Sequence, residues 1–128
     1  MRKILIVDDN PDILQVMQLL LGSRGFEVEV TTNAEDTFPK IESFDPGLIF
    51  LDVFLGGYDG RDICKQIKST EYLKKIPVIL FSANKVSTTS INESQSDAFI
   101  SKPFDIVDLV EKVNILLPEA YNTETMIA

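Results

Sequence analysis

None of the 128 residues is a histidine, and this absence narrows the chemistry that the chain can perform. It excludes zinc sites built on imidazole, histidine general bases and a phosphohistidine on this chain. Cysteine is almost absent as well: a single residue, Cys64, excludes an internal disulfide and is typical of a reducing compartment. Because Cys64 falls among apolar residues in a helical pattern, we interpret it as a buried core residue rather than a reactive thiol.

Long apolar runs and an excess of positive charge are also missing. No run approaches the roughly 20 apolar residues of a membrane-spanning helix, and the apolar segment after Met1-Arg2-Lys3 is too short for a signal peptide. The 12 basic and 20 acidic residues give a net charge of -8, which disfavours direct contact with nucleic acid and favours cationic partners or a divalent metal. We therefore expect a soluble, cytoplasmic protein without a membrane segment.

Strand-length apolar runs alternate with helical patterns along the chain. We predict strands at residues 4–7, 26–30, 47–52, 77–81 and 98–100. The run Leu48-Ile49-Phe50-Leu51 has no polar break, which is typical of a parallel strand buried on both faces. Such alternation predicts one α/β domain, residues 1–118, in which a five-stranded parallel sheet carries helices on both faces. The flavodoxin-like, doubly wound strand order 2-1-3-4-5 is the expected topology.

Four segments outside the buried strands carry signals of their own. Pro39 interrupts a helical pattern, which predicts that this helix begins late, near Asp36. The Ser- and Thr-rich stretch 85–96 favours a short or mobile helix. Residues 55–60 predict a glycine-rich loop, and residues 119–128 predict a flexible C-terminal tail.

Polar side chains follow four of the five predicted strands. The first strand ends at Asp8-Asp9, the third at Asp52 and the fourth at Ser82, and the fifth is followed by Lys102. Because the carboxyl ends of parallel strands meet at one edge, the order 2-1-3-4-5 brings these side chains together at the switch point. Each of them taken singly is an ordinary turn, capping or solvated residue. Their joint position at the strand ends favours a functional site.

Three carboxylates and one lysine form an electrostatically unbalanced group. Two unit charges about 4 Å apart repel by about 4 kcal/mol at an effective dielectric near 20, and Lys102 supplies one positive charge. A small hard cation, Mg²⁺ or Mn²⁺, is the natural counter-ion for such carboxylates and commonly holds a substrate phosphate as well. Ser82 and Lys102 could then bind phosphoryl oxygens, and an aspartate is a competent nucleophile towards phosphorus.

At this level the sequence resembles the receiver domain of two-component response regulators, of the single-domain CheY-like type, over roughly residues 2–118. Four motifs carry the resemblance: Ile4-Leu5-Ile6-Val7-Asp8-Asp9-Asn10, Leu51-Asp52 with Gly60 eight residues later, Phe81-Ser82-Ala83, and Phe99-Ile100-Ser101-Lys102-Pro103-Phe104. Each motif alone is weak, whereas the four together are highly specific.

The resemblance implies a phosphoacceptor and a metal site. Asp52 would accept a phosphoryl group from the phosphohistidine of a sensor histidine kinase or phosphotransfer protein. Asp9 and Asp52 would ligate Mg²⁺ directly, Asp8 would act largely through water, and the backbone carbonyl of Phe54 would be a further ligand. The lack of histidine agrees with a donor on another protein.

The resemblance also implies a switch. Lys102 and Ser82 would hold the phosphoryl oxygens, and the Lys102-Pro103 peptide bond would be cis. Movement of Ser82 towards the phosphoryl group would let Phe99 turn inward. That movement would reshape the face made by the fourth helix, the fifth strand and the fifth helix, which would bind a downstream protein target.

Several positions depart from the family pattern. Leu55-Gly56 replaces the usual Met-Pro, so we expect a more flexible loop there. Phe54 is bulky and apolar at a position that faces attacking water, which predicts slow self-dephosphorylation. Phe99 replaces the more common tyrosine, so packing alone would drive its movement.

Other protein classes fit the residues less well. A haloacid-dehalogenase-like phosphatase needs a second aspartate where this chain has Phe54, and a flavodoxin needs a phosphate loop where the chain has Asp8-Asp9-Asn10-Pro11-Asp12. The remaining alternative is a degenerate receiver that binds a protein without being phosphorylated.

Overall fold

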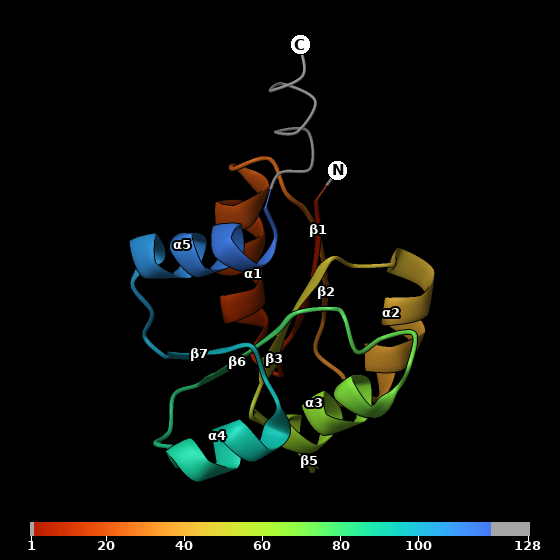
Figure 1. Ribbon diagram of the computed structural model, residues 1–128. Coiled ribbons are helices and arrows are strands. Elements are labelled where there is room, and N and C mark those ends of the chain that lie inside the picture. Colours follow the sequence, from red (N-terminus) through yellow and green to blue (C-terminus); the bar gives the residue numbers. More distant parts are fainter. Residues whose placement is uncertain (1, 119–128) are drawn as a thin grey trace.

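Five parallel strands form the central sheet of the molecule (Figure 1). They are β1 (Lys3–Val7), β2 (Glu27–Thr31), β3 (Leu48–Asp52), β6 (Val78–Ser82) and β7 (Ala98–Ser101). Their order in the sheet, β2-β1-β3-β6-β7, is the predicted order 2-1-3-4-5 when the long strands are counted along the chain, so the predicted fold class is confirmed. The computed structural model describes residues 2–118, and the predicted tail at 119–128 lies outside the described residues.

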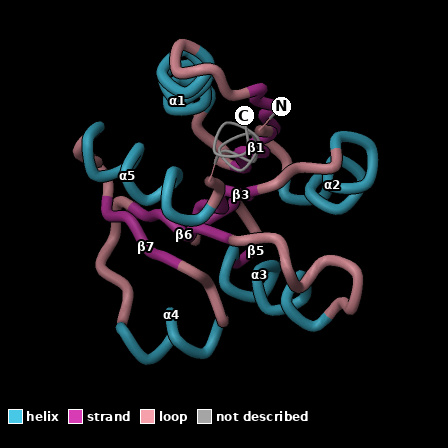
Figure 2. Tube along the Cα trace, turned by 45° about the horizontal axis from the view of Figure 1, so that its top comes forward, coloured by secondary structure: helices cyan, strands magenta, loops and turns pink. Residues whose placement is uncertain are grey.

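Helices cover both faces of this sheet. They are α1 (Pro11–Gly22), α2 (Thr37–Phe44, after a 3₁₀ turn at Ala34–Asp36), α3 (Gly60–Ser69), α4 (Thr88–Ser94) and α5 (Ile106–Leu116). Helices α1 and α5 lie on one side, and α2, α3 and α4 lie on the other (Figures 1 and 2). Among residues 2–118, no helix combines the length and the apolarity needed to cross a bilayer.

Two hydrophobic clusters fill the space between the sheet and its helices. Alternate residues of the fully buried strand β3 belong to different clusters, since Leu48 and Phe50 face α1 and α5 whereas Ile49 and Leu51 face α2 and α3. This division explains why the strand has no polar break in its sequence. The edge strand β2 is largely half-exposed, as its alternation of apolar and acidic residues predicts.

The ends of the helices follow the local sequence. The Asn10 side chain accepts a hydrogen bond from the Asp12 backbone N–H at 2.9 Å, and Pro11 takes the first helical position of α1. Pro39 is the third residue of α2, where its missing N–H has no intrahelical acceptor to lose, so the late start of this helix is confirmed. The stretch 85–96 contains the short helix α4, seven residues long.

The expected glycine-rich loop after β3 contains a short strand pair that was not predicted. Phe54–Leu55 (β4) and Tyr58–Asp59 (β5) form a small antiparallel hairpin, with Gly56 at its turn. Gly56 has a φ of 61°, a left-handed conformation that favours glycine. Composition predicted a turn at this place, but the cross-strand pairing depends on residues that have no strong strand pattern.

Cys64 tests the packing of α3 against the sheet. Its side chain is fully buried, and burial raises the pKa of the thiol to about 11. We therefore expect Cys64 to resist an aromatic disulfide reagent such as DTNB at pH 8 in native buffer and to react fully in denaturing urea. Rapid stoichiometric labelling of the native protein would contradict this packing.

Candidate functional site

The strand register brings the predicted site residues to one edge of the sheet. Val7 of β1 is level with Leu51 of β3, so Asp8 follows at the height of Asp52. On the other side of β3, Asp52 is level with Phe81, the residue that precedes Ser82. All these side chains therefore lie at the carboxyl ends of adjacent parallel strands, where such sheets bind their ligands.

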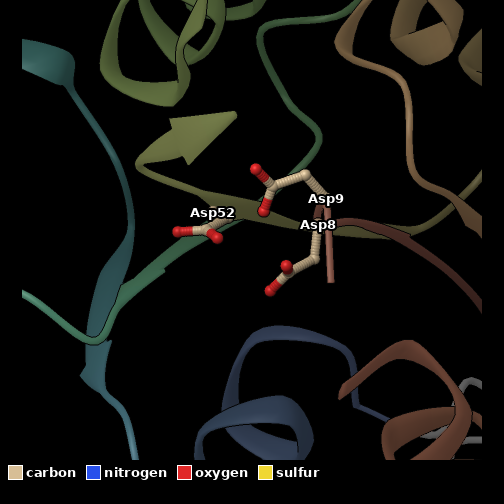
Figure 3. A group of neighbouring side chains, drawn as sticks. All are labelled: Asp8, Asp9 and Asp52. Atoms are coloured by element: carbon tan, nitrogen blue, oxygen red, sulfur yellow. The ribbon is translucent and has the colours of Figure 1, made fainter. Parts of the chain in front are cut away.

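Three carboxylates meet at this edge. One oxygen from each of Asp8, Asp9 and Asp52 lies within 4.8 Å of the others (Figure 3). Asp8 is completely buried and Asp52 is 6% exposed, whereas Asp9 is open to solvent. The group thus combines two buried acids, Asp8 and Asp52, with one solvent-exposed acid, Asp9.

These acids are not needed to begin helix α1. Asp8, Asp9 and Asn10 are all capable of capping a helix, but the capping hydrogen bond is accepted by Asn10. The Asp8 carboxylate instead accepts a hydrogen bond from the Asn10 backbone N–H at 2.8 Å, which orients its other oxygen towards the site. A role as turn residues therefore explains the hydrogen bond between Asp8 and the Asn10 N–H, but not why Asp8, Asp9 and Asp52 lie together.

Lys102 is the cation that contacts both buried acids. Its Nζ lies 2.5 Å from Asp8 Oδ2 and 3.2 Å from Asp52 Oδ2. The ammonium group also lies 4.5 Å from the centre of the Phe81 ring, a cation–π contact. No sequence pattern indicates this aromatic contact beyond the position of Phe81 next to Ser82.

The environment of Asp52 disfavours its charged form. Burial, followed by repulsion from Asp8, raises the pKa of the Asp52 carboxyl above its ordinary value, although Lys102 and the Phe54 backbone N–H act in the opposite direction. That N–H donates to Asp52 Oδ1 at 3.3 Å. An additional positive charge at this place would therefore stabilise the ionised carboxylate.

The three carboxylates suit a small divalent cation. Two oxygens that ligate one Mg²⁺ at about 2.1 Å lie at most about 4.2 Å apart, and the three oxygens here are already within 4.8 Å of one another. Adjacent oxygens in an octahedron are only about 3.0 Å apart, so side-chain rotations that bring the oxygens of Asp8, Asp9 and Asp52 closer together would complete such a site. Hard carboxylate oxygens are the ligands that Mg²⁺ and Mn²⁺ prefer.

The two predicted switch residues differ in their place relative to this group, since only Ser82 follows the residue of β6 that is level with Asp52. Ser82 is almost fully buried, and its Oγ accepts a hydrogen bond from the Asn84 backbone N–H at 3.1 Å. The backbone N–H of Lys102 donates to the Ser82 carbonyl at 2.8 Å, and the Lys102-Pro103 peptide bond is cis. Phe99 is partly buried against the hydrophobic cluster on the α2–α3 face, separate from the carboxylates.

Gly60 packs directly against the backbone of Asp52 and Val53. A Cβ atom on Gly60 would lie 2.0 Å from the backbone carbonyl oxygen of Asp52, a distance that real Cβ atoms do not reach. The Gly60 N–H also donates to the Val53 carbonyl at 2.7 Å. Glycine is therefore required at this position because the two backbone segments are in direct contact.

Comparison with known proteins agrees with this geometry. A family model described as the response regulator receiver domain matches residues 4–114. The DNA-binding response regulator MtrA of Mycolicibacterium smegmatis is 28% identical over 119 residues, which make up 91% of this chain and 50% of that protein. The chain therefore spans about half the length of this curated relative.

Solved structures share the fold closely. The receiver domain of a signal transduction histidine kinase from Syntrophus aciditrophicus is 30% identical, with a TM-score of 0.81 over 91% of this chain and 90% of that one. The response regulator TrrA of Thermotoga maritima, solved in complex with Mg²⁺-BeF, is 29% identical, with a TM-score of 0.83 over 91% of this chain and all of its own.

Alanine at Gly60 should disturb the site. We expect Gly60→Ala to lower the free energy of unfolding by about 1–3 kcal/mol and to weaken Mg²⁺ binding, because the Asp52 and Val53 backbone must move. Gly57→Ala is the matched control, since a Cβ on Gly57 would meet nothing within 4 Å. Urea unfolding and a Mg²⁺ titration of both variants measure these effects, and equal behaviour of the two alanines would contradict the close contact at Gly60.

Removal of the Asp52 charge should stabilise the metal-free protein. Because the folded-state pKa is raised above the ordinary value of 3.8, ionisation of Asp52 opposes folding at higher pH. In EDTA at pH 7, Asp52→Asn should therefore increase the Tm, and the gain should disappear as the pH falls below about 3.8, where the carboxyl is protonated in both states. A lower Tm for Asp52→Asn at pH 7 would show that its ion pair with Lys102 outweighs burial.

Proposed function

Because this chain belongs to the response regulator receiver domain family, we propose that Asp52 is the residue that accepts a phosphoryl group. The chain is thus a receiver of two-component signalling, a class that works through phosphorylation. The observation that carries the assignment of Asp52 is its position: a shielded carboxylate in contact with Lys102, with oxygens of Asp8 and Asp9 within 4.8 Å.

Asp52 is better placed for this reaction than its neighbours. Asp8 has no exposed surface and has the shorter contact with Lys102, at 2.5 Å. Asp9 is exposed to solvent, so its carboxylate is less shielded from water than that of Asp52. Asp52 lies at the end of the central strand β3, between β1 and β6, so that it combines partial access with a cation and two further acids.

The proposed reaction transfers a phosphoryl group from a partner's phosphohistidine. A carboxylate oxygen of Asp52 attacks phosphorus, the new P–O bond forms as the P–N bond breaks, and the imidazole of the partner leaves with the bonding electron pair. Lys102 places one positive charge beside the transferred oxygens, and the Ser82 hydroxyl donates a hydrogen bond to one of them. The donor, a sensor histidine kinase or a phosphotransfer protein, lies outside these 128 residues, because they include no histidine.

Receiver domains bind Mg²⁺ at an acidic pocket, and we assign that role here to Asp8, Asp9 and Asp52, with the Phe54 backbone carbonyl as a further ligand. When bound, Mg²⁺ or Mn²⁺ supplies positive charge that offsets both the carboxylates and the phosphoryl oxygens. The complex of TrrA with Mg²⁺-BeF supports this assignment by similarity.

Phosphorylation of Asp52 would change the positions of Ser82 and Phe99. Movement of the Ser82 hydroxyl towards the phosphoryl group breaks its hydrogen bond with the Asn84 N–H and frees space beside β7. Phe99, which has no hydroxyl, then moves by packing alone and changes the face formed by α4, β7 and α5. That face would contact a downstream protein, and we propose no direct contact of this chain with nucleic acid or a membrane.

A receiver that binds proteins without phosphorylation is not favoured. Such a degenerate domain has no need of the complete set of Asp8, Asp9, Asp52, Ser82 and Lys102, and all five are present. Lys102 and the acids that it contacts also form a shielded charge group, and burying such charges costs free energy. A domain that is never phosphorylated would bear this cost without using the charges.

Intact mass spectrometry tests the phosphoacceptor. With acetyl phosphate and Mg²⁺, the wild type should gain the mass of one phosphoryl group and Asp52→Asn should gain none. Asp45→Asn is the matched control, because Asp45 has a φ of 54°, a conformation that asparagine also adopts, and it should be phosphorylated like the wild type. An unmodified wild type would favour the phosphorylation-independent module.

The persistence of the phosphoryl group tests the role of Phe54. This side chain is 44% exposed beside Asp52, where it would hinder an attacking water molecule. We expect slow self-dephosphorylation of the wild type and a faster loss in Phe54→Ala, measured by intact mass after removal of acetyl phosphate. Tyr58→Ala, which truncates another exposed ring of the same hairpin, should match the wild type. A half-life of seconds for the wild type would contradict the role of Phe54.

A further inference from the structure

The residues that begin α3 pack along the segment that carries Asp52. Asp59 is the cross-strand partner of Phe54 in the hairpin. Gly60 donates a backbone hydrogen bond to Val53 and approaches the Asp52 carbonyl so closely that no Cβ fits. Any displacement of this part of α3 therefore displaces the Phe54 peptide, whose N–H donates to Asp52.

Arg61 connects this support to helix α4. Its Nε and Nη2 atoms bind both carboxylate oxygens of Asp59, at 2.9 and 2.7 Å. Its Nη1 donates to the Ser90 hydroxyl on α4 at 3.1 Å, and the guanidinium lies 5.9 Å from the centre of the Phe54 ring. Figures 1 and 2 show α3 and α4 side by side, so one side chain of α3 contacts the hairpin and the next helix at once.

The hydrogen bonds of Ser90 complete this connection. The Ser90 hydroxyl donates its proton to the Ser87 carbonyl at 3.0 Å, so that it is free to accept from Arg61. The separate capping bond of α4 runs from the Ser90 backbone N–H to the Ser87 side chain and does not need the Ser90 hydroxyl. Loss of this hydroxyl therefore removes the link to Arg61 and leaves the helix cap in place.

A local pair between Asp59 and Arg61 would by itself be an ordinary feature of a helix start. Partly exposed ion pairs contribute little to stability, and Arg61 keeps 26% of its side chain accessible. A local pair does not explain why Arg61 also contacts Ser90 of α4 and the Phe54 ring. These contacts also require the planar fork of arginine, because a lysine ammonium cannot hold both carboxylate oxygens and reach Ser90 in this geometry.

We propose that Arg61 is a positioning residue, which holds the Phe54 peptide against Asp52 and makes its position depend on helix α4. This inference rests on the proposed function, because the Phe54 peptide matters for phosphorylation only if Asp52 is the acceptor. Its consequence is a coupling in both directions: a partner that moves α4 changes how readily Asp52 reacts, and occupation of the site changes α4.

Phosphorylation kinetics test the positioning role. We expect Arg61→Ala to raise the Mg²⁺ concentration that half-saturates phosphorylation by acetyl phosphate about fivefold or more, with Arg61→Lys in between. Lys65→Ala, which removes an exposed cation one turn further along α3, should match the wild type. If Arg61→Ala lowers the Tm but leaves the rate and the half-saturating Mg²⁺ concentration unchanged, Arg61 is only structural and the proposal is wrong.

Amide NMR tests the connection without phosphorylation. Ser90→Ala should shift the backbone amide resonance of Phe54 in the wild-type background and leave it unchanged in an Arg61→Ala background, since Arg61 transmits the effect. An unshifted Phe54 amide in the first case, or an equal shift in both, would overturn the link to α4. A wild type that acetyl phosphate does not modify would refute the proposed function, while this NMR result would still decide whether Arg61 connects the two elements.

Discussion

One partly buried ammonium group that faces two buried carboxylates is the interaction on which the site depends. Lys102 neutralises one negative charge, and Asp8 and Asp52 provide two, with Asp9 nearby. Burial, followed by repulsion from Asp8, raises the pKa of Asp52, and the remaining negative charge makes a divalent cation favourable. The same cation and lysine then suit the oxygens of a phosphoryl group. The metal affinity and phosphoryl acceptance proposed here would therefore have one physical origin, an incompletely balanced group of charges shielded from water.

This charge group is held by backbone as much as by side chains. Parallel strands bring Asp8, Asp52 and Lys102 to one edge, and the start of α3 presses on the Asp52 carbonyl at Gly60. The hairpin after β3 directs the Phe54 N–H towards the Asp52 carboxylate. Small backbone shifts in this region change distances between charges, and electrostatic energies at low dielectric are sensitive to such changes. This sensitivity is the physical basis on which a contact as remote as that between α3 and α4 would affect the proposed chemistry.

Several local features followed from the sequence with a physical reason that the structure confirms. The fixed φ and missing N–H of Pro39 predicted the late start of α2. The unbroken apolar run of β3 predicted burial on both faces, and the alternation in β2 predicted an edge. The hairpin was not predicted, because two-residue strands carry too few side chains for a period to be seen. Here composition indicated a turn and could not indicate pairing.

The sequence alone determined the fold class and the chemical nature of the site, because both depend on periodic burial and on which residues end the strands. It also placed Asp8, Asp9, Asp52, Ser82 and Lys102 at one edge of the sheet, by the rule that parallel strands share their carboxyl ends. Only the tertiary structure decided which oxygens Lys102 contacts, that Phe81 lies beside its ammonium group, and that Arg61 reaches Ser90. Those contacts join residues far apart in the chain at a precision of tenths of an ångström. Side-chain rotamers and helix packing set that precision, and no local pattern in a sequence records them.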